Sequence, residues 1–153
     1  MKKVYFTAFE ITKNQQTKFN SIYNDSLKTE FINKLKPTLK WDAELKNEID
    51  YQQHATEFLL PKLNNGNYLI VATITKNLKY DDNIFAHTFI QATNLALIEN
   101  RQTSTYLYQV VDRNTGKPIE NAQVNLKNYN TGKYNKSIDK NFVTNNYGEF
   151  IYK

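Results

Sequence analysis

The sequence lacks cysteine altogether and contains only 4 glycines among 153 residues. The absence of cysteine excludes disulfide bonds, thiolate metal sites and a cysteine nucleophile. It does not define a compartment, because many proteins of the cell envelope also lack disulfides. The scarcity of glycine argues against a phosphate-binding loop, which needs several glycines in a short span.

Long apolar runs are missing as well. No segment approaches the roughly 18 apolar residues that a membrane-spanning helix needs, so we expect a soluble chain that does not span a membrane. Met1-Lys2-Lys3 is similar to the start of a signal peptide, but residues 4–18 are too polar to form its apolar region. If the protein is exported, we expect its targeting sequence to lie outside this sequence.

Positive charge is present without being concentrated. The formal net charge is +5. Residues 1–92 carry 12 Lys and Arg against 10 Asp and Glu, and residues 93–153 carry 8 against 5. Nucleic-acid binding usually requires a basic stripe or cluster. We therefore expect no nucleic-acid partner.

Aromatic residues are abundant, with 11 Tyr and 9 Phe. Such residues favour strands, and the 40% hydrophobic content is typical of a folded protein. Alternating apolar residues predict many short strands, and we expect the single tryptophan, Trp41, to pack in a core. The predicted strands cover residues 2–11, 38–45, 54–63, 67–75, 84–100 (two strands), 104–112, 121–129 and 142–153, the last as a hairpin on the turn Asn145–Gly148.

One segment has helical periodicity instead. Its apolar residues recur at helical intervals, which predicts one amphipathic helix or two short ones lying on a sheet, at about residues 15–35. Pro37 is expected to end this helical segment. The apolar positions are Phe19, Ile22, Tyr23, Leu27, Phe31, Ile32 and Leu35.

The strand spacing predicts a mainly β protein made of antiparallel β-sandwiches. We place a domain boundary near Ala92–Asn94, which gives a first domain at 1–92 with a helical insertion and a second at 93–153. The second domain would have about five strands, fewer than the roughly seven usual for this class. We therefore expect it to be truncated at its carboxyl end.

Candidate catalytic and metal-binding residues are few. His54 and His87 have no partners at metal-ligand spacing, and a zinc site needs three or more ligands. The serines (Ser21, Ser26, Ser104 and Ser137) are not part of a G-x-S-x-G nucleophile motif. We therefore predict no catalytic residue, no metal site and no cofactor, and we do not expect an enzyme.

The segment from Asp112 to Gly116 superficially resembles the start of a calcium-binding loop. The EF-hand pattern requires glycine at the sixth position and glutamate at the twelfth, but Gly116 is fifth and Gln123 is twelfth. Asp112, Asn114, Gly116 and Pro118 are also typical turn formers. We interpret the segment as a turn between two strands.

The same region carries a recurring motif. Residues 106–126 resemble the D-x-x-T-G-x-P-[IL]-x-x-A-x-V-x-L signature of exported β-sandwich domains, which is followed by T-x-x-x-G-x-F. Several families share it, among them carboxypeptidase-regulatory-like and transthyretin-like modules. The matching residues are Asp112, Thr115, Gly116, Pro118, Ile119, Ala122, Val124, Leu126, Thr144, Gly148 and Phe150.

The preceding residues narrow the resemblance. They resemble the passage between two consecutive macroglobulin domains of bacterial alpha-2-macroglobulin-like proteins. Residues 3–11 and 35–45 resemble the preceding domain in versions from Bacteroidetes-type bacteria. The matching residues are Pro61, Leu63, Gly66, Tyr68, Ile70, Ala72, Phe89, Thr93, Asn94, Leu95, Ala96 and Leu97.

The resemblance implies two macroglobulin-type modules, immunoglobulin- or fibronectin-like in fold, from the N-terminal arm of a protease-trapping inhibitor. It implies a scaffold role, with other domains of the same parent chain and target proteases as partners, and a location in the cell envelope or outside the cell. No thioester or catalytic residue is carried over, because the sequence has no cysteine. The alternative is a regulatory-like module that binds carbohydrate or a protein through loops or an edge strand.

Overall fold

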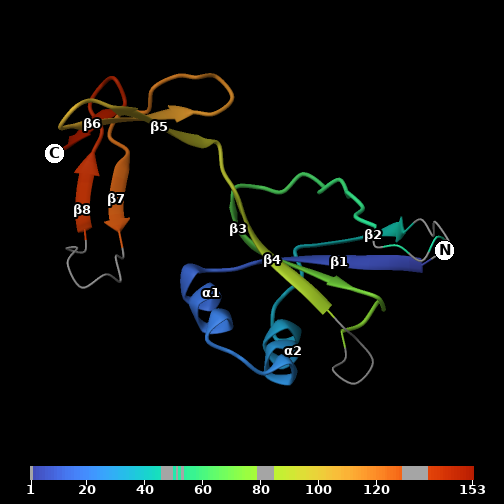
Figure 1. Cartoon of the computed structure of the whole chain (residues 1–153). Coiled ribbons are helices and arrows are strands. Elements are labelled where there is room, and N and C mark those ends of the chain that lie inside the picture. Colours follow the sequence, from blue (N-terminus) through green and yellow to red (C-terminus); the bar gives the residue numbers. More distant parts are fainter. Residues whose placement is uncertain (1, 46–49, 51, 53, 79–84, 129–137) are drawn as a thin grey trace. The chain divides into compact units, whose positions relative to one another are not determined.

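The computed structural model describes residues 2–45, 50, 52, 54–78, 85–128 and 138–153 (Figure 1). These residues form nine strands and two helices. The chain divides into two compact units, Met1–Ala92 and Thr93–Lys153.

The first unit contains a four-stranded antiparallel sheet in the order β2-β1-β3-β4. Its strands are β1 (Lys2–Glu10), β2 (Leu39–Leu45), β3 (Gly66–Thr73) and β4 (Phe85–Ala92). As the alternation predicts, Thr7 and Phe9 lie on one face of β1, and Phe6 and Ala8 lie on the other. The sheet therefore has two apolar faces that need cover.

The helical segment is confirmed as two short helices, α1 (Lys13–Asn20) and α2 (Asp25–Asn33). Thr12 caps α1 through a capping box with Gln15, and the Asn24 side chain accepts hydrogen bonds from the backbone N–H groups of Ser26 and Leu27 at the start of α2. The second helix ends at Asn33, before Pro37, because Leu35 N–H already bonds the Ile32 carbonyl in a tighter turn.

The helices cover one face of the sheet. Phe19 from α1 and Ile32 from α2 are almost fully buried against Phe9, Leu69 and Val71. The other face holds a second cluster around Ala8, Tyr68 and Ile70. Trp41 packs against this second cluster, with its ring stacked on Phe6 at 5.2 Å between centroids, so the prediction that it packs in a core is confirmed.

The predicted strand at 54–63 is wrong, because the structure contains no strand in this segment. Leu59, a residue of the predicted alternation, is 92% exposed. The ring centroid of Phe58 instead lies 5.3 Å from that of Phe6, and Leu63 packs against the cluster around Tyr68. The segment therefore contributes apolar side chains to the second face without pairing, and Pro61 removes a donor that a ladder would need.

The second unit contains two antiparallel sheets, one in the order β5-β6-β9 and one formed by β7 and β8. Its strands are β5 (Leu95–Arg101), β6 (Tyr106–Asp112), β7 (Gln123–Asn128), β8 (Ile138–Val143) and β9 (Glu149–Tyr152). Phe142 of β8 stacks on Phe150 of β9 at 4.7 Å between ring centroids. The two sheets are therefore in contact through their inner faces.

The predicted hairpin at 142–153 is also wrong. The turn is present, since Gly148 N–H bonds the Asn145 carbonyl at 2.9 Å. However, β8 pairs with β7, whereas β9 pairs with β6. The chain passes from one sheet to the other at this turn, and in the new pairing Tyr108 of β6 stacks on Phe150 of β9 at 5.0 Å between ring centroids.

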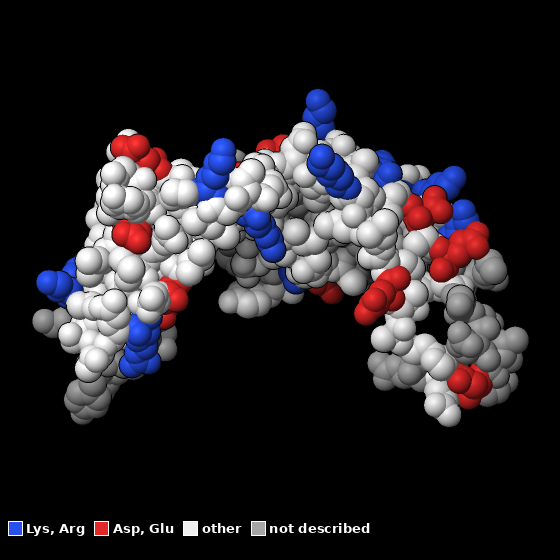
Figure 2. Space-filling view, turned by 90° about the horizontal axis from the view of Figure 1, so that it is seen from above, with Lys and Arg blue, Asp and Glu red and all other residues white. Residues whose placement is uncertain are grey.

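The predicted mainly β, antiparallel fold is confirmed by these sheets. No helix among the described residues is both long enough and apolar enough to cross a membrane. Figure 2 shows Lys and Arg side chains standing among uncharged residues, with Asp and Glu interspersed, on the face that it displays. On this face, the positive charge is dispersed.

Candidate functional site

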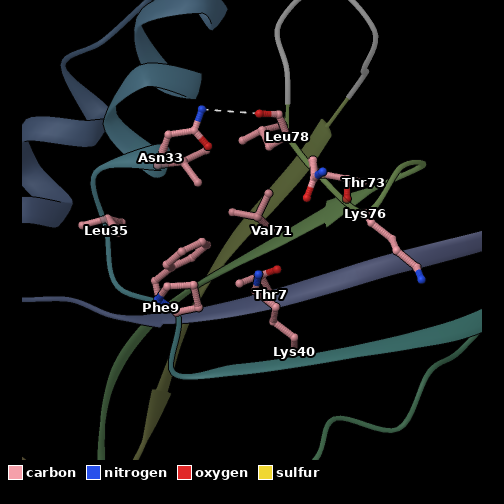
Figure 3. A pocket seen from close by; sticks show the side chains of 12 residues that line it. Thr7, Phe9, Asn33, Leu35, Lys40, Val71, Thr73, Lys76 and Leu78 are labelled. Atoms are coloured by element: carbon pink, nitrogen blue, oxygen red, sulfur yellow. Dashed lines mark hydrogen bonds between the residues drawn. The ribbon is translucent and has the colours of Figure 1, made fainter.

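The pocket of greatest interest lies in the first unit, between the end of α2 and the sheet (Figure 3). Its volume is about 240 Å³. Its apolar wall consists of Phe9, Ile32, Leu35, Val71 and Leu78. Three of these residues are buried in the helix-side core, so the wall is continuous with that core.

Side-chain hydrogen bonds to the backbone brace the pocket. Asn33 Nδ2 donates to the Leu78 carbonyl oxygen at 3.3 Å, which ties the end of α2 to the chain after β3 (Figure 3). The Thr73 hydroxyl donates to the Thr75 carbonyl at 2.7 Å. Because these groups bond backbone atoms, they fix the walls.

Two lysines stand at the rim. Lys40 of β2 is the cross-strand partner of Thr7, which in turn faces Val71 across β1 and β3, so these three side chains share one face of the sheet. Figure 3 shows Lys40 beside Thr7, and Lys76 extending outward at the edge after β3. Neither lysine takes part in the ion pairs found among the described residues.

The lining includes no carboxylate, histidine or serine among the residues that the structure describes. Its functional groups are two ammonium groups, two threonine hydroxyls and asparagine amides. These groups can hold a ligand by charge and hydrogen bonding, but they do not form an acid–base pair. The arrangement is therefore suited to binding.

The two histidines have separate environments. His54 Nε2 lies 2.7 Å from Asp50 Oδ1 at an exposed position, and this hydrogen bond lowers the pKa of Asp50. His87 lies on β4, with its ring 4.9 Å from that of Phe19. Burial and the nearby positive charge of Lys28 lower the pKa of His87, while Asp25 raises it. No group of three or more potential metal-ligating side chains occurs within the described residues.

The Asp112 segment forms the turn that we predicted. Asp112 Oδ1 accepts hydrogen bonds from the Thr115 N–H at 2.8 Å, the Thr115 hydroxyl at 2.9 Å and the Asn114 N–H at 3.0 Å. These bonds lower the pKa of Asp112, with the Thr115 backbone bond as the largest cause. Gly116 has a φ of 70°, which reverses the chain before Pro118 bridges back to Val111. Gln123, the residue at the twelfth loop position, lies in β7.

The serines lie at helix ends, at an exposed position before β6, or outside the described residues. The Ser21 hydroxyl donates to the Lys18 carbonyl at the end of α1. The Ser26 backbone N–H donates to the Asn24 side-chain oxygen that caps α2. Ser104 is exposed before β6. Ser137 lies outside the described residues. Ser21 and Ser26 therefore take part in local hydrogen bonds at helix ends.

The pocket lysines were not singled out from the sequence. Lys40 and Lys76 are 36 residues apart along the chain. They approach one pocket only because β2 and the end of β3 lie on opposite sides of β1. The one available signal was Lys40 itself, a charged residue in the strand pattern of residues 38–45 whose alternation places it on the face opposite Trp41.

Comparison with solved structures finds a shared fold. The chain is similar to a native alpha-2-macroglobulin fragment from Escherichia coli spanning domains MG0-NIE-MG1, with a TM-score of 0.62 and 13% identity; the match covers 99% of this chain and 48% of that one. It is also similar to the NIE-MG1 fragment of the same protein, with a TM-score of 0.58, 13% identity, and coverage of 99% and 73%.

A scan of protein-family models and a search of curated proteins both found no match. The chain spans about half the length of the longer fragment. At this identity, the likeness concerns the fold, and it confirms the predicted macroglobulin-type fold class. The chain therefore shares its fold with the alpha-2-macroglobulin domains that these fragments span.

Proposed function

We propose that the chain provides non-catalytic structural modules of an alpha-2-macroglobulin-like protein. The observation that carries this proposal is the fold shared over 99% of the chain with the native fragment from Escherichia coli. The motif residues add independent support, because Asp112 and Gly116 form a turn and Thr144 and Phe150 are buried.

We assign one module to each compact unit, residues 1–92 and 93–153. Both similar fragments span the domains called NIE and MG1, so these two domains are the proposed counterparts of the units. Among the described residues, the first unit combines one sheet with two helices, whereas the second contains two facing sheets. This difference favours two distinct module types.

The protease-trapping role follows from the family resemblance. In this proposal the modules position other domains of the parent chain, which engages target proteases in the cell envelope or outside the cell. The source that the motif resemblance favours is a Bacteroidetes-type bacterium. The modules supply shape and rigidity, since their apolar residues are used in the sheet faces.

The test is an inhibition assay on the product of the complete reading frame that encodes this chain. We expect a long product that slows cleavage of a large protein substrate, and we expect the 153-residue chain by itself to leave the protease active. A reading frame that ends near Lys153, or inhibition by the chain alone, would contradict the proposal.

The regulatory-like binding module remains the alternative because of a group of tyrosines on one face of the second unit. Tyr106 lies 6.3 Å from Tyr108 and 6.1 Å from Tyr152 between ring centroids. Arg101 lies over the Tyr106 ring, Lys140 lies over the Tyr152 ring, and Tyr108 is buried. Since the rings are packed and partly covered, we expect no hit on a glycan array; a saturable hit that Tyr106→Ala removes would favour the alternative.

A further inference from the structure

We infer that the pocket beside α2 binds a small aliphatic carboxylate, with the hydrocarbon chain on the apolar wall and the carboxylate at Lys40 and Lys76. This binding site goes beyond the proposed scaffold role and does not depend on it. The inference rests on the composition of the wall, the charge of the rim and the contrast with a neighbouring hollow.

The wall is suited to a hydrocarbon chain. Phe9, Ile32 and Val71 are 5%, 2% and 2% exposed, so the base of the pocket is formed by the core itself. The volume of about 240 Å³ is slightly below the ~300 Å³ at which pockets for drug-sized ligands begin. A short chain therefore fits better than a long or branched ligand.

The rim is suited to an anion. Lys40 and Lys76 provide two positive charges, and no carboxylate lines the pocket among the described residues. The Thr7 hydroxyl shares the sheet face with Lys40 and can donate a hydrogen bond to a carboxylate. Lysine has a flexible four-carbon stem, so the outward-pointing Lys76 can turn toward a bound anion.

A neighbouring hollow shows why the carboxylate belongs on the α2 side. This second hollow, of about 310 Å³, is also lined by Lys40 and Lys76, but it includes Asp42. Asp42 accepts a hydrogen bond from Lys3 Nζ at 3.1 Å. Its negative charge disfavours an anion there, whereas the described lining of the pocket beside α2 includes no carboxylate.

The test uses calorimetric titration of the 153-residue chain with butanoate, hexanoate and octanoate. We expect the Kd to fall about fourfold for each added methylene until the pocket is full, which is the increment for burying one methylene group. We expect the double variant Lys40→Gln, Lys76→Gln to weaken octanoate binding at least tenfold. The matched control Lys13→Gln, Lys62→Gln removes the same net charge from exposed positions outside the pocket lining and should change the Kd less than twofold.

A second variant tests the apolar half without removing charge. Thr7→Ile keeps a β-branched residue in β1 and adds bulk inside the pocket, so we expect it to remain folded and to lose octanoate binding. Three results would overturn the inference: no saturable octanoate binding, equal loss in both lysine pairs, or 1-octanol binding as tightly as octanoate.

Discussion

At the residue scale, two glycines with the same backbone angle have different surroundings. Gly116 and Gly148 have φ angles of 70° and 71°. A Cβ at Gly116 would meet nothing within 4 Å, whereas one at Gly148 would lie 2.5 Å from the Val110 carbonyl oxygen and 3.0 Å from the Ile119 nitrogen. The second glycine is therefore required by packing as well as by its φ angle.

These surroundings predict different costs for the same substitution. Gly116→Ala should lower the free energy of unfolding by about 1 kcal/mol, the cost of a left-handed φ for alanine. Gly148→Ala should cost at least about 3 kcal/mol, because the clash with backbone atoms adds to that cost. Urea denaturation of both variants checks this, and equal midpoints would contradict it.

Thr144 is a buried residue whose hydroxyl bonds two backbone groups of another segment in the second unit. Its hydroxyl donates to the Ile119 carbonyl at 2.7 Å and accepts from the Ala122 N–H at 2.8 Å, and the side chain is 2% exposed. Thr144→Val keeps the shape but leaves both backbone groups unpaired, so we expect a loss of about 2–4 kcal/mol. Thr105→Val, at a partly exposed position of the same unit, should change stability by less than about 0.5 kcal/mol in the same denaturation experiment. Similar losses in the two variants would be inconsistent with this role.

The lowered pKa of His87 predicts that the stability of the fold depends on pH. Since its pKa is lowered in the folded state, the unfolded chain binds the proton more readily, and stability falls as the pH drops below the unfolded pKa of about 6.5 toward the lower folded value. The wild type should therefore lose more stability than His87→Phe between pH 7.5 and pH 5.5. The measurement is the urea midpoint of both proteins at the two pH values, and parallel shifts would rule out this contribution.

At the element scale, the helices depend on local capping and on their buried face. Periodicity predicts their existence, and the sequence around Asn24 explains why there are two helices: a side chain that caps a new helix interrupts the run. The two wrong strand predictions arise instead from strand pairing, which the local pattern does not fix. Residues 54–63 have a local strand pattern but do not pair with another strand. Residues 142–153 have a local hairpin pattern, but β8 pairs with β7 and β9 pairs with β6.

Removal of the N-cap side chain at Asn24 should lower the stability of the first unit measurably. Asn24→Ala removes the acceptor for the Ser26 and Leu27 N–H groups and should destabilise the first unit by about 1 kcal/mol. Asn24→Ser should restore most of this stability, because serine is also a good N-cap. Thermal unfolding followed by circular dichroism tests both variants, and a serine variant as unstable as the alanine variant would exclude capping as the cause.

At the scale of the whole molecule, each unit has its own apolar contacts. Phe9 and Leu69 belong to a cluster within the first unit, whereas Phe142 and Phe150 stack within the second. Each unit therefore has an internal source of stability.

This separation predicts a localised effect of core damage. Leu69→Ala should cost the first unit about 2–5 kcal/mol by leaving a cavity at a fully buried position. Amide resonances of residues 93–153 should keep their folded chemical shifts at a urea concentration that unfolds the first unit. Simultaneous loss of both sets of resonances would show that the units unfold as one.

The sequence by itself determined the features that depend on neighbours along the chain. Alternation placed Phe6 and Thr7 on opposite faces, helical spacing located the helices, and the residue types at Asp112 and Gly116 defined a turn, because backbone geometry and local hydrogen bonds act over a few residues. Only the tertiary structure decided that β9 leaves β8 to pair with β6, that residues 54–63 stay unpaired, and that Lys40 and Lys76 meet at one pocket. Those outcomes depend on which apolar surfaces bury one another, and such contacts join residues that are far apart in the sequence.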